Sequence, residues 1–282
     1  RGTTDMKGFV ALAVLALRAA ASRRLTRPLA LVLTHNEEVG SLGAQALVRD
    51  LPREAVLPRA TIVGEPTSLG AVRMHKGHLK IRFTIRGRAA HSGTPHLGRS
   101  AIEPAGRLVV ALAALRREFE SVHTDTSGYF AETPFPVINI GRIRGGDAVN
   151  VVPDRCEVEI GVRLLPGMTA GPCIERLEAV ARDATGMTRL EAEVINDNPS
   201  MLLPESAAIH RAALEILGQT ESRGVSFASD AGILSRDLDM YCILWGPGSM
   251  DVAHQPDEHL DLDELERAGQ ILETFINHFC SN

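Results

Sequence analysis

The sequence lacks features that would place it in several common classes of protein. It has no surplus of basic residues, because 30 Lys and Arg stand against 35 Asp and Glu, which gives a net charge of -5 at pH 7. That balance argues against a general binder of nucleic acid or of an anionic membrane surface. The four cysteines are far apart and form no C-x-x-C pair. This spacing favours reduced thiols in a cytoplasmic protein over a disulfide framework.

Long apolar runs are also missing. The run Phe9–Leu17 resembles the apolar part of a secretory signal, but it is shorter than the roughly 20 residues that span a membrane. We expect Lys7–Ala21 instead to form a buried helix, because its apolar residues fall on nearly every side. The 282 residues, 44% of them hydrophobic, suffice for a large buried core and contain no internal repeat.

The first and last parts of the chain alternate between strand and helix patterns. Such alternation is typical of an α/β domain with a parallel sheet covered by helices. We expect residues 1–74 and 199–282 to form this domain together. The predicted strands are Leu29–Thr34, Ala60–Val63 and Tyr241–Trp245, and the further helices are Leu42–Asp50, Ser206–Leu217 and a last helix capped by Asp261 and Glu264.

The middle of the chain, residues 75–198, has a different order of strand and helix patterns and is expected to be an inserted domain. Its order of strand, helix, strand, strand, helix, strand is the ferredoxin-like split pattern. In the first strand Leu79 to Ile85 alternate with Lys80, Arg82 and Arg86, which we interpret as solvated protection of an edge strand. The predicted strands are His78–Arg86, Val137–Ile143, Arg155–Leu164 and Arg189–Ile195, and the helices are Ser100–Phe119 and Cys173–Ala184.

Residues that commonly bind metals follow three predicted strands. The first strand leads into Glu37 and Glu38, the second into Glu65, and the last into a loop that carries His254. A fourth acid, Asp5, precedes the first helix. Ligands of open α/β sheets bind beyond the carboxyl ends of the strands. Several carboxylates with one imidazole suit zinc or a neighbouring divalent ion.

Each of these residues also has a simpler interpretation when it is taken alone. Asp5 could cap the helix, and Glu37 and Glu38 could be a solvated pair. Glu65 could be a turn acid, and a lone histidine such as His254 is more often a surface or core residue. The occurrence of all of them at strand ends favours the metal site.

A set of motifs in fixed order carries a resemblance to a known family. The chain resembles the acetylornithine deacetylase and succinyl-diaminopimelate desuccinylase family of di-zinc acylamino-acid hydrolases, along its whole length. The implied fold is a zinc-hydrolase domain with a mixed, mainly parallel sheet, plus an inserted α+β lid. The motifs are Asp5-Met6-Lys7-Gly8, Asn36-Glu37-Glu38, Gly64-Glu65-Pro66, His91-Ser92, Arg163-Leu164-Leu165-Pro166, Gly246-Pro247-Gly248 and Ala253-His254-Gln255-Pro256-Asp257-Glu258.

The resemblance implies a role for each metal-type residue. Asp5 would bridge two divalent ions, zinc with cobalt as the alternative, and Glu38 and His254 would bind one ion and Glu65 the other. Glu37 would be the general base for a hydroxide that bridges the metals and attacks the amide. The implied reaction removes the acetyl group of N2-acetyl-L-ornithine in arginine biosynthesis. Acetylcitrulline deacetylase, succinyl-diaminopimelate desuccinylase and aminoacylase are the sibling specificities.

The resemblance also assigns roles outside the metal ligands. The inserted domain would be a lid that forms a homodimer, and His91 would stabilise the oxyanion, often in the partner subunit's site. Asn150 and Arg163 would hold the substrate α-carboxylate, and Gly246 would be a further substrate-binding position. The plainer alternatives are that His91 caps the following helix and that Arg163 is an exposed strand residue.

The sequence departs from the family in one respect. The family's first metal histidine, in a His-x-Asp motif upstream of the bridging aspartate, has no counterpart before Asp5, so we interpret the chain as N-terminally truncated. A non-catalytic dimerising scaffold is the alternative. We also expect Asp230 to lie near the site, and whether it contacts a substrate ammonium stays open at this point.

Overall fold

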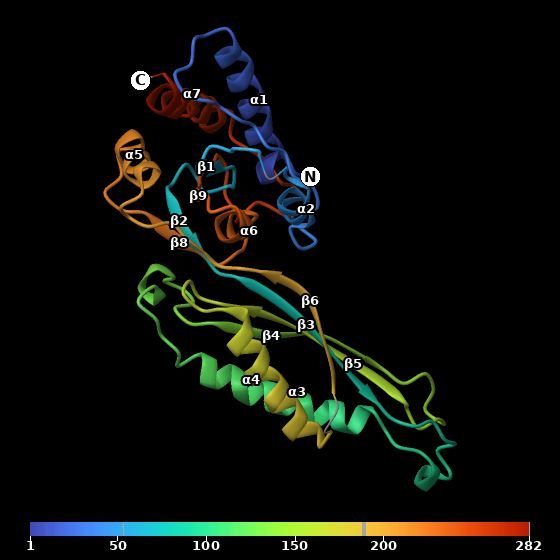
Figure 1. Cartoon of the computed structure of the whole chain (residues 1–282). Coiled ribbons are helices and arrows are strands. Elements are labelled where there is room, and N and C mark those ends of the chain that lie inside the picture. The colour runs from blue at the N-terminus through green and yellow to red at the C-terminus, as the bar shows by residue number, and fades with distance from the viewer. Residues whose placement is uncertain (53, 188–189, 282) are drawn as a thin grey trace. The chain divides into compact units, whose positions relative to one another are not determined.

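The computed structural model describes residues 1–52, 54–187 and 190–281. The chain divides into two compact units, of which the first combines Arg1–His75 with Met201–Asn282 and the second is Lys76–Ser200 (Figure 1). Among the residues that the structure describes, none of the helices combines the length and the apolar composition of a membrane span.

The first unit is built on a mixed sheet, as predicted. Its strands lie in the order β1 (Ala60–Val63), β9 (Tyr241–Leu244), β2 (Val72–His75) and β7 (Met201–Leu202), and β8 (Arg223–Val225) pairs with β2. The pairs β1/β9 and β2/β8 are parallel, whereas β9/β2 and β2/β7 are antiparallel. The three strands β2, β7 and β8 were missed in the sequence, because segments of two to four residues carry too few side chains to show a period of two.

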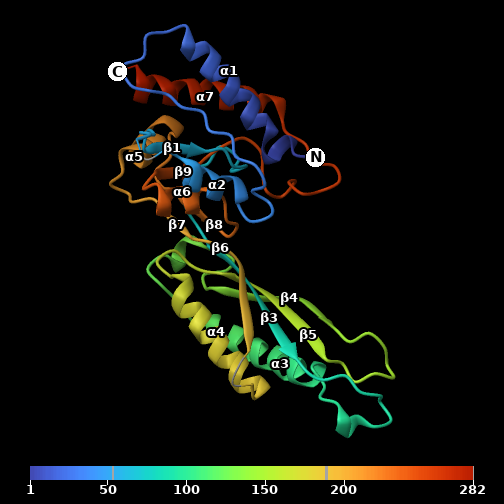
Figure 2. The same cartoon turned by 45° about the vertical axis from the view of Figure 1, so that its right-hand side comes forward.

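Helices lie on both sides of β1 and β9. Figures 1 and 2 show α1 and α7 side by side on one side of these strands, with α2 and α6 on the other. Helix α5 packs against α7 and also against β1 and β9. The helices are α1 (Gly8–Ala21), preceded by a single turn at Thr3–Lys7, α2 (Leu42–Asp50), α5 (Ala208–Leu217), α6 (Ala231–Asp237) and α7 (Leu262–Cys280).

The core of this unit is centred on Trp245, which is fully buried. Its ring meets Phe9 of α1 edge-on at a centroid distance of 6.2 Å and Phe275 of α7 at 5.6 Å. Three aromatic rings of this size bury enough apolar area to dominate the packing of the sheet against α1 and α7.

Helix α7 follows its sequence pattern closely. Asp261 caps it by accepting a hydrogen bond from the Glu264 backbone N–H at 2.9 Å, and Ala268 and Leu272 are buried on its inner face. The capping box is not completed, because the Glu264 carboxylate accepts a hydrogen bond from the Gly248 N–H at 3.1 Å instead.

Two expectations for the first unit are wrong. Helix α1 is not buried on every side: Phe9 and Ala20 are its buried residues, and Leu15 is 59% exposed, because within the described residues it packs mainly on α7. The segment Leu29–Thr34 runs outside any strand. An apolar run of strand length forms a strand only where a neighbouring backbone pairs with it. Strand β1 pairs with β9 and not with this segment.

The second unit has the predicted ferredoxin-like order of elements. Its antiparallel sheet has the strand order β4-β5-β3-β6, with α3 and α4 packed together on one face. The predicted start of the last strand, Arg189, lies outside the described residues. The elements are β3 (His78–Arg86), α3 (Ile102–Phe119), β4 (Val137–Gly145), β5 (Arg155–Arg163), α4 (Ala170–Thr185) and β6 (Glu191–Asn198), with single 3-10 turns at Pro95–Leu97 and Ser127–Tyr129.

The two faces of β3 differ as its alternation indicates, but the strand is not at an edge. Leu79, Ile81, Phe83 and Ile85 are fully buried in the core formed with α3 and α4. Because β3 lies between β5 and β6, our interpretation of its basic residues as edge protection is wrong.

Two of the basic side chains of β3, Arg82 and Arg86, are paired across the sheet instead. Arg82 donates hydrogen bonds to Glu159 of β5 at 2.9 Å and to Glu193 of β6 at 2.8 Å, and Arg86 donates to Glu191. Cross-strand pairs of opposite charge stabilise a sheet modestly and favour one register.

Candidate metal centre

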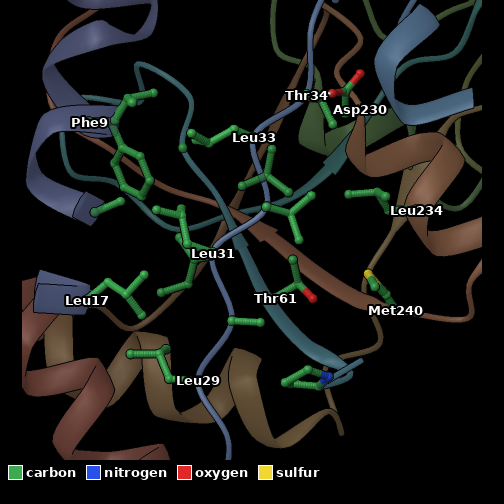
Figure 3. Close-up of a pocket in the computed structure, with 18 of the residues that line it drawn as sticks. Phe9, Leu17, Leu29, Leu31, Leu33, Thr34, Thr61, Asp230, Leu234 and Met240 are labelled. Atoms are coloured by element: carbon green, nitrogen blue, oxygen red, sulfur yellow. Dashed lines mark hydrogen bonds between the residues drawn. The ribbon is translucent and has the colours of Figure 1, made fainter. Parts of the chain in front are cut away.

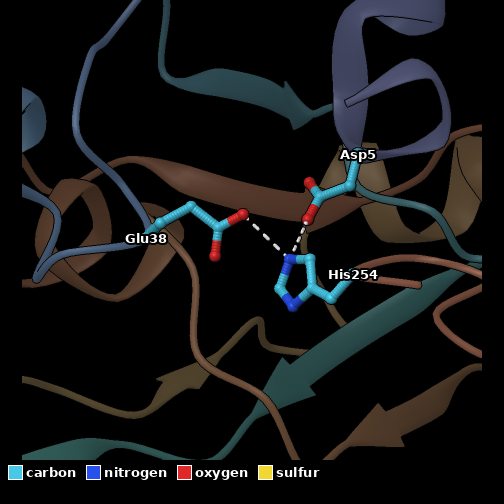
Figure 4. Close-up of side chains that lie close together, drawn as sticks. All are labelled: Asp5, Glu38 and His254. Carbon is cyan, nitrogen blue, oxygen red and sulfur yellow. Dashed lines mark hydrogen bonds and ion pairs between the residues drawn. The ribbon is translucent and has the colours of Figure 1, made fainter. Parts of the chain in front are cut away.

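Three residues of the ligand type converge in the first unit. The Nε2 atom of His254 lies 2.8 Å from Asp5 Oδ2 and 2.8 Å from Glu38 Oε1 (Figure 4). One ligand atom from each residue lies within 4.8 Å of the other two. The three side chains come from the turn before α1, the segment before α2 and the loop after β9, so tertiary folding brings them together.

Local structure explains why these side chains are available to a ligand. Lys7 immediately precedes α1, and no side chain caps that helix. The Asp5 carboxylate contacts His254 instead of the helix end. Asn36 and His254 have φ of 56° and 62°, in the left-handed region that few non-glycine residues adopt. Such conformations are held by surrounding contacts and are common in functional loops.

Glu37 and Glu65 lie beside this cluster and are more buried than Glu38. Burial is the largest cause that raises the pKa of Glu37 to about 7, and the charges of Asp230, Glu38 and Asp5 add to it against the lowering effect of His254. Burial likewise raises the pKa of Glu65 well above its usual value, followed by the charges of Glu37 and Asp5. Both carboxyl groups therefore sit in an apolar and already negative environment.

Asp230 belongs to the same acidic group. Its Oδ2 accepts a hydrogen bond from the Thr34 hydroxyl at 2.6 Å, which ties the segment leading to Glu37 to the residue before α6. The residue is 6% exposed, and its charge raises the pKa of both Glu37 and Glu65. The expected acid near the site is thus present.

A cavity of about 880 Å³ reaches from the acids into an apolar region of the same unit. Figure 3 shows Thr34 and Asp230 at one end of the drawn lining and Leu17 and Leu29 at the other. Leu29, Leu31 and Leu33 line it along the segment that was predicted to be a strand. The lining beyond the carboxylates is largely apolar, although it also includes Arg59 and Thr61.

Gly64 and Gly246 allow close packing around the loop that carries Glu65. A Cβ atom on Gly64 would lie 2.1 Å from the Phe9 ring, and one on Gly246 would lie 2.7 Å from the Glu65 carbonyl oxygen. The Gly246 N–H donates to the Thr67 hydroxyl at 3.2 Å, and its carbonyl accepts from Leu69 N–H at 3.0 Å. Gly246, predicted as a substrate-binding position, has its backbone groups engaged with Thr67 and Leu69, in the loop that follows Glu65.

We expect Gly246→Ala to lower the free energy of unfolding by about 1–3 kcal/mol, the usual cost of forcing an extra methyl group into a close-packed site. Urea denaturation followed by circular dichroism measures this change. Gly106→Ala is the matched control, because a Cβ there meets nothing within 4 Å and alanine favours the helix by about 1 kcal/mol. Equal stability of Gly246→Ala and the parent protein would contradict the tight packing.

The predicted residues His91, Asn150 and Arg163 lie in the second unit. The His91 Nδ1 accepts a hydrogen bond from Gly93 N–H at 3.0 Å, and the Ser92 N–H donates to the Asn150 carbonyl at 2.9 Å. His91 and Asn150 are thus neighbours, and His91 is exposed.

Arg163 lies at the far end of β5 from this pair. The strand runs from Arg155 to Arg163, and at about 3.4 Å per residue its eight steps span about 27 Å. The charge of Arg163 helps to lower the pKa of His78 to about 3, after burial, which is the larger cause. Within one copy of the chain, Asn150 and Arg163 do not share a binding position for one carboxylate.

The residues of the acidic cluster fit a divalent transition metal. Two carboxylate oxygens and one imidazole nitrogen lie within reach of a common ion, and these are donor types that zinc prefers. The additional negative charge of Glu37, Glu65 and Asp230 would be offset by a cation. Both the types of donor atom and the surrounding negative charge therefore favour a bound divalent cation.

Comparison with known proteins shows which class of protein this chain resembles. A model of the peptidase dimerisation domain matches residues 73–187. The acetylornithine deacetylase of Edwardsiella ictaluri is 33% identical over 99% of this chain and 71% of its own length. That of Pectobacterium carotovorum is 32% identical over the same shares.

Solved structures agree on the fold. The aminopeptidase PepT of Bacillus cereus has a TM-score of 0.68 at 22% identity, over 97% of this chain and 70% of that one. An M20 family metallo-carboxypeptidase of Sulfolobus solfataricus has a TM-score of 0.70 at 15% identity, over 98% and 76% of the two chains.

The fold, the acidic centre and these relatives define a hydrolase of the metallopeptidase and deacylase class. The chain belongs to the M20 family of peptidases and amidohydrolases, on the branch that includes the acetylornithine deacetylases.

Proposed function

We propose that the protein is a metal-dependent amidohydrolase that removes the acetyl group of N2-acetyl-L-ornithine, a step of arginine biosynthesis. The observation that carries this proposal is the convergence of Asp5, Glu38 and His254 beside the buried Glu37. Relatives named acetylornithine deacetylase at about a third identity favour this substrate over the sibling acyl amino acids.

Asp5, Glu38, His254 and Glu65 are the residues that would hold two divalent ions, zinc with cobalt as the alternative. A bound ion supplies Lewis-acid polarisation of the amide carbonyl and lowers the pKa of water. Asp5 is the candidate bridge between the ions, because its Oδ2 contacts His254 and its charge also acts on Glu65.

Glu37 acts as the general base. Its carboxylate takes the proton of the attacking water and delivers it to the departing amine, whose bond to the acetyl carbon breaks. Burial raises the pKa of Glu37 toward neutrality, and a base of that strength both accepts and returns a proton efficiently.

The second unit completes the site in a homodimer. The peptidase dimerisation domain matches most of this unit. Because Asn150 precedes the start of β5 and Arg163 ends the strand, we assign His91 and Asn150 to the active site of the partner subunit and Arg163 to the substrate carboxylate. The four cysteines are free and buried, which suits a cytoplasmic protein.

The test is a hydrolysis assay with the purified protein loaded with zinc. We expect the highest kcat/KM for N2-acetyl-L-ornithine among a panel with N-acetylcitrulline, N-succinyl-diaminopimelate and N-acetylmethionine. A chelator should abolish the activity, and zinc or cobalt should restore it. A higher kcat/KM for another panel member would establish a sibling specificity, and a zinc-loaded dimer without turnover would support the scaffold alternative.

A further inference from the structure

Glu258, an acid outside the candidate ligand set, forms hydrogen bonds with the segment that carries Asp5. The Glu258 carboxylate accepts three backbone hydrogen bonds, from Gly2 N–H at 2.6 Å, from Thr4 N–H at 2.9 Å and from Asp5 N–H at 3.1 Å. Both carboxylate oxygens take part, so the two ends of the segment are held at once. Hydrogen bonds to an ionised carboxylate are roughly twice as strong as those between neutral groups.

Neighbouring contacts join the same two segments. Thr4 is 1% exposed and its hydroxyl donates to the His259 carbonyl. A Cβ on Gly8, at the start of α1, would lie 2.4 Å from the Leu260 side chain. The loop that follows β9 and the turn that precedes α1 are therefore packed together on both sides of Glu258.

The position of Glu258 links two candidate ligands. It lies four residues after His254, on the same loop, and its hydrogen bonds end on the backbone of Asp5. His254 and Asp5 contact each other through Nε2 and Oδ2 at 2.8 Å. The loop after β9 thus supplies the His254 imidazole. Through Glu258 it also holds the backbone of Asp5, whose carboxylate contacts that imidazole.

We propose that Glu258 is a positioning residue that holds the Asp5 carboxylate in place for metal binding. This inference rests on the proposed function, because it takes Asp5 to be a ligand. Without Glu258 three backbone donors lose their acceptor, and the turn before α1 samples conformations in which Asp5 points away from His254. The ion then binds more weakly although every ligand is still present.

A merely structural link predicts something different. If Glu258 only joined two segments, its loss would lower stability without acting on the metal through Asp5. The two roles separate in a double-mutant cycle, because an effect that passes through Asp5 disappears once the Asp5 carboxylate is removed.

The experiment compares Glu258→Ala and Glu258→Gln in the full protein, with Asp257→Asn as the control. Asp257 is the exposed neighbouring acid, and no described residue hydrogen-bonds to its carboxylate. Glutamine keeps one acceptor oxygen, so we expect the zinc Kd to rise about 10-fold for Glu258→Gln and up to about 100-fold for Glu258→Ala. Asp257→Asn should change it less than about 2-fold, on the scale of ordinary surface changes.

Two further readouts decide the outcome. Amide hydrogen exchange of residues 1–8 in metal-free protein should accelerate in Glu258→Ala, and in an Asp5→Ala background the change in zinc Kd should fall below about 2-fold. Unchanged exchange, or an equal loss of affinity in both backgrounds, would overturn the proposal. If Asp5→Ala alone leaves the zinc Kd unchanged, Asp5 is no ligand and the proposed metal site fails, while the exchange data still report whether Glu258 holds the turn.

Discussion

Replacing Glu37 with glutamine is expected to lower kcat for N2-acetyl-L-ornithine by about 10²- to 10⁴-fold, the usual contribution of a positioned general base. Glutamine has nearly the same shape but cannot accept the proton. Because Glu37 is not one of the three converging ligand residues, the zinc content of the variant should equal that of the parent protein. Steady-state kinetics and a metal count on the same preparation measure both quantities.

Two variants sharpen this prediction. Glu266→Gln, on the exposed side of α7, removes one acid outside the site and should leave kcat unchanged. Glu38→Gln should lose zinc and activity together, because its Oε1 contacts His254 at 2.8 Å. Activity of Glu37→Gln within 10-fold of the parent would rule Glu37 out as the base, and loss of zinc would make it a ligand instead.

The environment of Glu37 gives a physical reason for the large effect. Burial and the neighbouring acids Asp230, Glu38 and Asp5 raise its pKa to about 7, and the Thr34–Asp230 hydrogen bond holds the segment that leads to it. A carboxyl group in bulk water titrates near 4.3 and is a far weaker base. Burial, and after it the like charge of the neighbouring acids, therefore makes Glu37 a stronger base than an exposed carboxylate.

Elements with a complete local pattern could be predicted from the sequence. The alternation of β3 shows which of its side chains are buried, and Asp261 marks the start of α7, because both signals lie within a few residues of the structure they specify. Two of the candidate ligands, Glu65 and His254, were predicted for the same reason, since they follow strands whose ends are visible in the sequence.

Features that depend on distant partners could not be predicted. Leu29–Thr34 has the composition of a strand, yet the pairing that defines a strand belongs to other residues. Glu258 stands in a motif beside His254, but its three donors are more than 250 residues away in the chain. Similarly, whether β3 lies at an edge depends on where β5 and β6 pair. Periodicity carries no information on such long-range contacts.

The assignment of Asn150 and Arg163 to one carboxylate shows a related limit. Motif order places both in the second unit, but it does not give their separation. Asn150 precedes the start of β5 and Arg163 ends the strand. This separation is why we propose that the two residues act in a dimer, with Asn150 supplied by the partner subunit.

His254→Ala is expected to weaken zinc binding by about 100-fold. Structural zinc sites bind with about 10–16 kcal/mol shared among four ligands, so one ligand contributes about 3 kcal/mol, which corresponds to about two orders of magnitude in Kd. His259→Ala is the control, because this exposed histidine lies on the same loop and its ring hydrogen-bonds only to the Asp257 backbone among the described residues. Isothermal titration with zinc measures both variants.

Zinc should also stabilise the two variants differently. At a zinc concentration of 100 times the parent Kd, binding adds about 2.7 kcal/mol to the stability of the parent protein and of His259→Ala, but only about 0.4 kcal/mol to that of His254→Ala. Thermal unfolding with and without zinc reports this difference. Overlapping titrations of His254→Ala and the parent would mean that the 2.8 Å contacts of His254 with Asp5 and Glu38 are only hydrogen bonds to the two carboxylates, and not those of a metal ligand.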